Sequence, residues 1–269
     1  MTFGGGSHRY VDAARRLARE ARIPEIAEIR IESQHSLETT HRPFWRQHGE
    51  FITSHPRLFG FAIWKPRIIG FHLETLPAGW GLIYLDAGCV LNSTAAARER
   101  LVEYQRRSED HGVWATCLDR PQWNSEEFLE KSWTKEDLLL QVGASEEVRE
   151  SPQWQSGMML LTPTAEVRGL VYEWEQLSVM SDYHFSTDSP SVRANGSTFV
   201  EHRHDQSIFS VLAKSKGFRA VSDETWFAPN WFEEGRGFPI WSARWRRGSR
   251  MTRLHPASVY RSFMGSREG

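Results

Sequence analysis

Apolar and polar residues follow two periods along this chain, one typical of helices and one typical of buried strands. Residues 9–22 place Val11, Ala14 and Leu17 at helical spacing, with basic residues on the other face. Residues 1–3 before this segment and residues 28–31 after it have the pattern of short strands. A strand, a glycine turn, a helix and a second strand within about 30 residues predict a βαβ unit.

The alternation of strand and helix patterns continues to about residue 221. Further strands are expected at 82–85, 113–117, 157–161 and 218–221. Helices are expected at 35–54, 66–76, 94–107, 135–142 and 164–180, and another should begin near His204 or Asp205. This order predicts an α/β fold with a single mostly parallel twisted sheet flanked by helices. We expect one domain over residues 1–269, in which 222–269 form an irregular, basic, Trp-rich extension.

Composition narrows the class of protein. The chain has 269 residues, 39% apolar composition and a net charge of −1, which favours one sizeable domain and gives nucleic-acid binding little support. Cys89 and Cys117 are expected to be reduced thiols. Because the apolar runs are far shorter than the roughly 20 residues of a membrane span, we expect no transmembrane segment. The glycine-rich start does not have the pattern of a signal peptide, so a cytoplasmic location is expected, with peripheral attachment to the inner face of a membrane left open.

One candidate for chemistry lies at the end of the strand expected at 82–85. The apolar run ends abruptly in Asp86, Ala87 and Gly88. A buried strand that delivers a carboxylate into a glycine turn can hold a divalent metal at the edge of a sheet. The alternative is structural, because Asp86 could equally cap the turn or the helix that follows.

A second candidate is the polar segment around His204, Asp205 and Gln206, where a loop becomes a helix. Side chains at this point can project beyond the edge of the sheet, and a helix N-terminus favours an anion. The alternative is again structural, because Asp and Ser are common N-caps and a histidine-rich turn can simply be solvated.

These segments, with a third around Lys65, resemble a family. The chain contains Trp64-Lys65-Pro66, then Asp86-Ala87-Gly88-Cys89, then His204-Asp205-Gln206-Ser207, in that order. This ordered set resembles a group of bacterial GT-A-type glycosyltransferase-like proteins over about residues 3–238. More distantly, Asp205-Gln206 is similar to the Asp-Gln pair of retaining glycosyltransferases of the glycogenin type.

The resemblance implies a GT-A-like fold. It also implies a nucleoside-diphosphate sugar as donor, a UDP-sugar being the first choice, and Mn²⁺ or Mg²⁺ as cofactor. The acceptor is unknown and could be a glycan, a lipid-linked molecule or a small molecule. Asp205 and Gln206 are the expected catalytic residues at the anomeric carbon, with retention of configuration implied by the resemblance alone. The expected donor-binding residues are Thr2, Phe3, Gly4, Gly5, Lys65, Asp86, Ala87 and Gly88. The expected acceptor-binding residues are Trp154, Gln155, Ser156, Gly157 and His204.

The metal expectation departs from the family pattern at one position. Most enzymes of this type have Asp-x-Asp, whereas this chain has Gly88 in the third place. The expected metal ligands are Asp86 and His255; His204 or water could also fill the gap, or metal dependence could be weak or absent. Lys65 could contact the donor phosphates or anchor the start of a helix.

Several features leave alternatives open. Five arginines between residues 244 and 253 could form a solvated face, close over a diphosphate, or bind an anionic acceptor or membrane surface. The whole chain could also be a non-catalytic protein that binds a nucleotide sugar or a glycan. A metal hydrolase built on His202, His204, Asp205 and Asp86 is a third possibility. A nucleophilic hydrolase has little support, because no Gly-x-Ser-x-Gly elbow is present.

Overall fold

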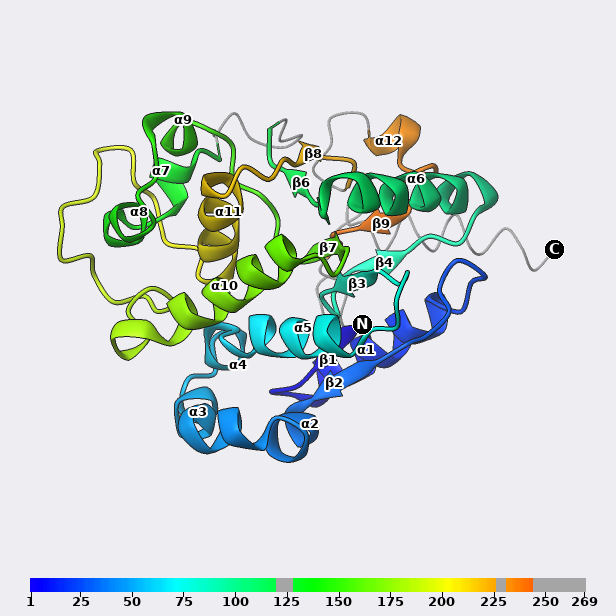
Figure 1. The fold of residues 1–269 in the computed structure, drawn as a ribbon, viewed down its shortest axis with the longest axis horizontal. Coiled ribbons are helices and arrows are strands. Elements are labelled where there is room, and N and C mark those ends of the chain that lie inside the picture. Colours follow the sequence, from blue (N-terminus) through cyan, green and yellow to red (C-terminus); the bar gives the residue numbers. More distant parts are fainter. Residues whose placement is uncertain (120–127, 226–230, 244–269) are drawn as a thin grey trace.

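The N-terminal part of the chain forms the βαβ unit that the sequence predicts. A computed structural model describes residues 1–119, 128–225 and 231–243 (Figure 1). Strand β1 (Thr2–Gly4) leads into helix α1 (His8–Glu20), and strand β2 (Ile31–Ser33) then pairs with β1 in parallel. The second strand begins three residues later than its sequence pattern indicates.

The helices follow the expected order, with small differences at their ends. The segment expected as one helix at 35–54 is two helices, α2 (Gln34–Thr39) and α3 (Arg42–Ser54). The longer helices after these are α5 (Trp64–Thr75), α6 (Ala95–His111), α8 (Glu136–Val142), α10 (Ala165–Tyr183) and α11 (Asp205–Ser215). The remaining helices are single turns: α4 (Leu58–Phe61), α7 (Glu130–Trp133), α9 (Glu146–Arg149) and α12 (Trp231–Glu234).

The prediction of a single, mostly parallel sheet is wrong. The described strands form small separate sheets. The sheet with the most strands is antiparallel, with β7 (Met158–Leu161) between β3 (Leu82–Leu85) and β5 (Val113–Trp114). Two further pairs join distant segments. They are β4 (Val90–Leu91) with β9 (Ile240–Trp241), antiparallel, and β6 (Thr116–Cys117) with β8 (Val221–Ser222), parallel. A strand buried on both faces reads as an apolar run whichever way its neighbours point, so the sequence pattern does not reveal direction.

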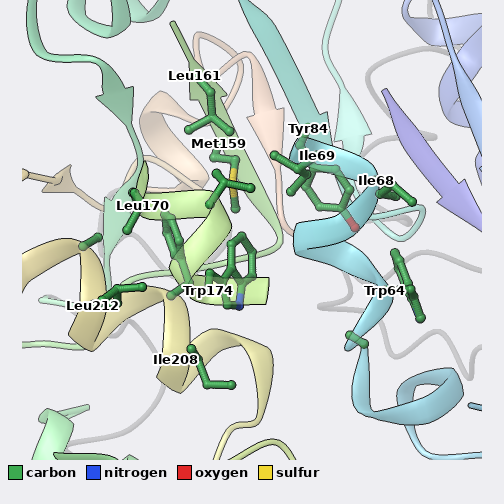
Figure 2. Packing of buried hydrophobic residues seen from close by; sticks show 14 of the residues in the cluster. Trp64, Ile68, Ile69, Tyr84, Met159, Leu161, Leu170, Trp174, Ile208 and Leu212 are labelled. Carbon is green, nitrogen blue, oxygen red and sulfur yellow. The ribbon is translucent and has the colours of Figure 1, made fainter. Parts of the chain in front are cut away.

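Helices cover both faces of the β3–β7–β5 sheet. On one face, Tyr84 of β3 and Met159 of β7 pack among residues of α5, α10 and α11, such as Ile69, Trp174 and Ile208 (Figure 2). The other face is covered by residues of α1 and α6. This burial fixes the end of β3 relative to the first turns of α5 and α11. In the described part of the chain, no helix is both long and apolar enough to cross a bilayer.

A left-handed turn precedes α5. Leu58, Phe59, Gly60, Phe61 and Ala62 all have positive φ. Residues with a side chain rarely adopt this backbone conformation. Each non-glycine residue held in it costs the folded state about 1 kcal/mol of stability. The turn is fastened to α5 by the Trp64 indole, whose N–H donates to the Phe59 carbonyl over 2.9 Å. The unusual backbone therefore leads directly into the helix start that carries Lys65.

Candidate functional site

Three sequence segments meet on the ammonium group of Lys65. Its Nζ donates to Asp205 Oδ2 over 2.5 Å and lies 3.2 Å from Asp86 Oδ1. It also donates to the Ser156 carbonyl over 3.4 Å. The side chains of Lys65 and Asp205 are only 4% and 7% exposed, whereas that of Asp86 is 46% exposed. Asp86 is therefore the carboxylate through which this site reaches solvent.

Asp86 is held at the end of β3 by backbone and side-chain contacts. Its N–H donates to the Gly157 carbonyl over 2.7 Å, and its own carbonyl accepts from the Cys89 N–H over 2.8 Å, which closes the turn. The Tyr84 hydroxyl donates to Asp86 Oδ1 over 2.7 Å. The turn uses the backbone of Asp86, so the side chain has a separate role, which is to join Tyr84 and Lys65.

Tyr84 is a site residue that the sequence reading missed. It is completely buried and lies on β3, two positions before Asp86, which directly follows the end of that strand. Residues two apart on a strand point to the same face, so this spacing was the signal that could have found it.

Asp205 is the first residue of α11, and its carboxylate points away from its own helix. The Lys65 ammonium and the Ser156 hydroxyl both donate to Asp205 Oδ2, the latter over 2.8 Å. The N-cap is instead His204, whose side chain makes no capping bond. The Ser207 hydroxyl accepts from the Arg203 N–H over 3.0 Å. The structural alternative for Asp205, an N-cap, is thus not what its side chain does.

The charges at this site stabilise one another. Burial by itself would lower the pKa of Lys65, but attraction to Asp205 and Asp86 outweighs it and holds that pKa above its usual value. Burial, together with the Asp86 charge, raises the pKa of Tyr84 and of Cys89. Tyr84 therefore remains a neutral donor at neutral pH. With one ammonium and two carboxylates, the centre carries a formal charge of −1.

The expected donor-side residues at the start of the chain lie in the interior beside the start of α5. Thr2, Phe3, Gly4 and Gly5 are all buried. The Phe3 ring stacks on Trp64, with ring centroids 3.7 Å apart. These residues thus support the helix turn that contains Lys65, and their contact with a donor stays a prediction.

Ala87 and Gly88 occupy the turn after Asp86. Ala87 packs on Ala14 of α1, and a Cβ added at Gly4 would also meet Ala14, at 2.9 Å. Arg16 donates to the carbonyl oxygens of Ala87 and Cys89 over 2.9 and 2.7 Å. Helix α1 therefore fixes this turn beside β1.

The expected acceptor-side residues are divided between different surroundings. Ser156 and Gly157 belong to the Lys65 centre, as described. Trp154 is buried against Phe209 of α11. The Gln155 side chain points elsewhere, because its amide donates to Asp223 Oδ1 and to Thr116 Oγ1, each over 3.0 Å.

His204 and His202 are held by backbone carbonyls. His204 Nδ1 lies 2.8 Å from the Ser186 carbonyl, and its Nε2 is 3.6 Å from Asp188 Oδ1. His202 Nε2 donates to the Phe185 carbonyl over 2.8 Å, while its Nδ1 accepts from a backbone N–H. Burial lowers the pKa of both histidines. Because both ring nitrogens of His202 are engaged, the geometry does not favour a metal hydrolase built on this pair.

Gln206 lies outside the Lys65 centre. Its amide donates to Gln153 Oε1 over 2.6 Å, and Gln153 in turn donates to the fully buried Glu130. Its catalytic role stays a prediction, since the side chain is engaged in this network. His255 and the five arginines at 244–253 lie outside the described residues.

The described residues can offer a hard cation one good ligand. Both contacts to Asp86 go to Oδ1, and a Cβ at position 157 would stand 3.0 Å from Oδ2, so Gly157 leaves space beside that oxygen. Among the residues described, no three His, Cys, Asp or Glu side chains converge on a metal position. Mg²⁺ is often bound by one or two carboxylates together with substrate phosphates and water, and Asp86 fits that manner of binding.

Comparisons with known proteins give little more. No protein-family model matches the chain, and no curated protein matches it. Among solved structures it is similar to the crystal structure of mouse xyloside xylosyltransferase 1 in its apo form. That similarity covers 90% of this chain and 95% of the mouse chain, with a TM-score of 0.43 and 11% sequence identity.

Proposed function

We propose that this chain is a glycosyltransferase that takes a sugar from a nucleoside-diphosphate donor, with Asp86 on the diphosphate side and Asp205 at the sugar. The observation that supports this most is the meeting of Asp86 and Asp205 on one buried ammonium, although they lie far apart in the sequence. The two carboxylates that the proposal assigns to the reaction thus lie beside the same ammonium group.

Asp86 would bind the donor together with a divalent cation. The centre has a formal charge of −1, so a bare diphosphate would be repelled by it. A hard cation, when bound, offsets charge on the diphosphate as it departs. Asp86 is suited to hold it because its carboxylate is half-exposed and is fixed in orientation by Tyr84.

Asp205 would stabilise positive charge at the anomeric carbon. Its carboxylate is fixed by Lys65 and Ser156, and a preorganised negative group stabilises an oxocarbenium-like centre without rearranging during the reaction. Lys65 has two contributions: it holds Asp205 in place, and it supplies positive charge between the two carboxylates. The proposal includes three finer expectations. The donor is a UDP-sugar, the cation is Mn²⁺ or Mg²⁺, and the configuration at the anomeric carbon is retained.

The proposal is tested with Asp86→Asn and Asp205→Asn, using Asp110→Asn at an exposed position of α6 as the matched control. UDP-sugars are screened by thermal shift with and without Mn²⁺, and donor turnover is measured. We expect Asp86→Asn to lose the Mn²⁺-dependent shift and turnover, and Asp205→Asn to keep nucleotide binding but lose turnover. Full activity in a folded Asp86→Asn variant would contradict the assignment.

A second candidate function is binding without transfer. Gly88 stands where a second carboxylate would assist the reaction, and this favours a protein that holds a nucleotide sugar or a glycan. A saturable shift with nucleoside diphosphate, together with no donor hydrolysis or transfer under any condition of the screen, would select this candidate.

A further inference from the structure

A second, strongly acidic pocket lies away from the Lys65 centre. It has a volume of about 730 Å³ and is lined by residues of α6, of the end of β8 and the two positions after it, and of α12 and the segment that follows it. Figure 1 shows where these helices and this strand lie in the fold. Six carboxyl side chains line it: Glu99, Glu103, Asp223, Glu224, Glu233 and Glu234. Among the described lining residues the one cation is Arg100, which pairs with Glu103 and Glu224. The described wall is therefore strongly negative.

The carboxyl group of Asp223 is buried in this wall with one oxygen unsatisfied. The residue is only 6% exposed. Its Oδ1 accepts from the Gln155 amide over 3.0 Å, and from the Thr225 N–H and hydroxyl over 3.0 and 2.7 Å. Its Oδ2 is also buried and has no hydrogen-bond donor from any residue that the structure describes. A buried oxygen of this kind destabilises the fold until it receives a donor.

We propose that this pocket binds an organic cation bearing a primary ammonium group, with Asp223 as the buried anchor. An ammonium offers three donors and a positive charge, which match an unsatisfied carboxylate oxygen inside an acidic wall. The volume is in the range of small-molecule sites.

An organic cation fits this pocket better than a metal ion. The carboxylates come from three separate segments, which are α6, the residues after β8, and α12, and no three of those described converge on a metal position. Glu103 and Glu224 already form ion pairs with Arg100. The proposal does not depend on the proposed glycosyl transfer, because Lys65, Asp86 and Asp205 are not part of this pocket.

Binding should be coupled to proton release. Burial raises the pKa of Asp223 to about 7, against the lowering effect of its bonds from Thr225 and Gln155. An ammonium ligand favours the ionised carboxylate, so near pH 7 it should expel a proton. Asp119 accepts a hydrogen bond from the Asp223 N–H, and the Cys117 thiol interacts electrostatically with the Asp223 carboxylate. Arg100 and the other five carboxylates line the same pocket.

The test uses the full chain and spermidine as the probe, by isothermal titration calorimetry at pH 7 in two buffers of different ionisation enthalpy. We expect saturable binding with proton release in the unaltered protein. Asp223→Asn should weaken binding by about tenfold or more and abolish the proton release, because the anchor loses its charge. Glu147→Gln, at an exposed position of α9, is the matched control and should bind as the unaltered protein does.

Three results would overturn the proposal: no saturable binding, equal binding by Asp223→Asn and the control, or displacement of spermidine by Mg²⁺ at equal or lower concentration. Circular dichroism checks that each variant folds. If Asp223→Asn does not fold, Glu99→Gln with Glu234→Gln removes two charges from exposed wall positions. Unchanged affinity in that double variant would equally refute an ammonium site here.

Discussion

Removing the Lys65 ammonium gives the sharpest test of the candidate centre. Lys65→Met keeps a long, unbranched side chain and deletes the charge. Asp205 then stays 7% exposed, with the Ser156 hydroxyl as its remaining described contact at Oδ2. Removing one partner of a buried ion pair costs about 3–5 kcal/mol, because the other charge is left buried and uncompensated.

Loss of the contact between Lys65 and Asp86 should contribute little to this destabilisation. The Asp86 side chain is 46% exposed, and exposed pairs contribute about 1 kcal/mol or less. The double variant Lys65→Met with Asp205→Asn removes both charges, so its loss should be smaller than the sum of the single losses by about 2–3 kcal/mol. The same cycle with Asp86→Asn should show a coupling energy below about 1 kcal/mol.

Urea unfolding followed by tryptophan fluorescence measures these free energies. The ion pair between Lys216 and Glu173 serves as the control cycle. Lys216 Nζ lies 2.5 Å from Glu173 Oε2, the same distance as in the Lys65–Asp205 pair, but the two side chains are 34% and 45% exposed. That cycle should give less than about 1 kcal/mol. Additivity of the Lys65 and Asp205 changes to within about 0.5 kcal/mol would refute the buried ion pair.

Three further predictions concern stability. Tyr84→Phe should lower the free energy of unfolding by about 1–2 kcal/mol, through loss of its hydrogen bond to a carboxylate, and urea unfolding would show it. Gly60→Ala should lower the free energy of unfolding more than Gly79→Ala does in the same assay. Both glycines have positive φ, but a Cβ at position 60 would stand 2.7 Å from Ile52 Cα, whereas a Cβ at position 79 would meet nothing within 4 Å. Equal losses of stability in the two variants would contradict the clash. Asp223→Asn should raise the melting temperature relative to the unaltered protein, and more at pH 8 than at pH 5. The folded-state pKa of Asp223, about 7, lies above its unfolded value, so the unaltered protein loses stability as pH rises between the two; a pH-independent difference would be evidence against that shift.

The sequence pattern identified individual elements well where burial is one-sided or ends abruptly. The strand at 82–85 has the expected bounds, because a run of apolar residues stops at Asp86. The helix expected near His204 or Asp205 begins at Asp205. Helices α5 and α10 lie close to their predicted ranges, since apolar residues recur at helical spacing along them.

Strand direction and side-chain partners could not be read in this way. The apolar residues of β7 are buried on both faces, and that pattern is the same for parallel and antiparallel neighbours. Gln155 and Gln206 stand next to true members of the centre, yet their amides bond elsewhere. Successive side chains point in different directions, so adjacency in the sequence does not by itself place two side chains in the same site.

The amino-acid sequence by itself determined which local elements form, and it placed Lys65, Asp86 and Asp205 at the ends of those elements. Local periodicity, strand ends and helix starts depend on residues a few positions apart, and these are visible in the sequence. Only the tertiary structure decided that the three side chains form one ion-paired centre around a buried ammonium group, and that Tyr84 orients Asp86. Ion pairing at 2.5–3.2 Å between segments 21 to 140 residues apart depends on how the helices pack on both faces of the β3–β7–β5 sheet, and no local pattern encodes it.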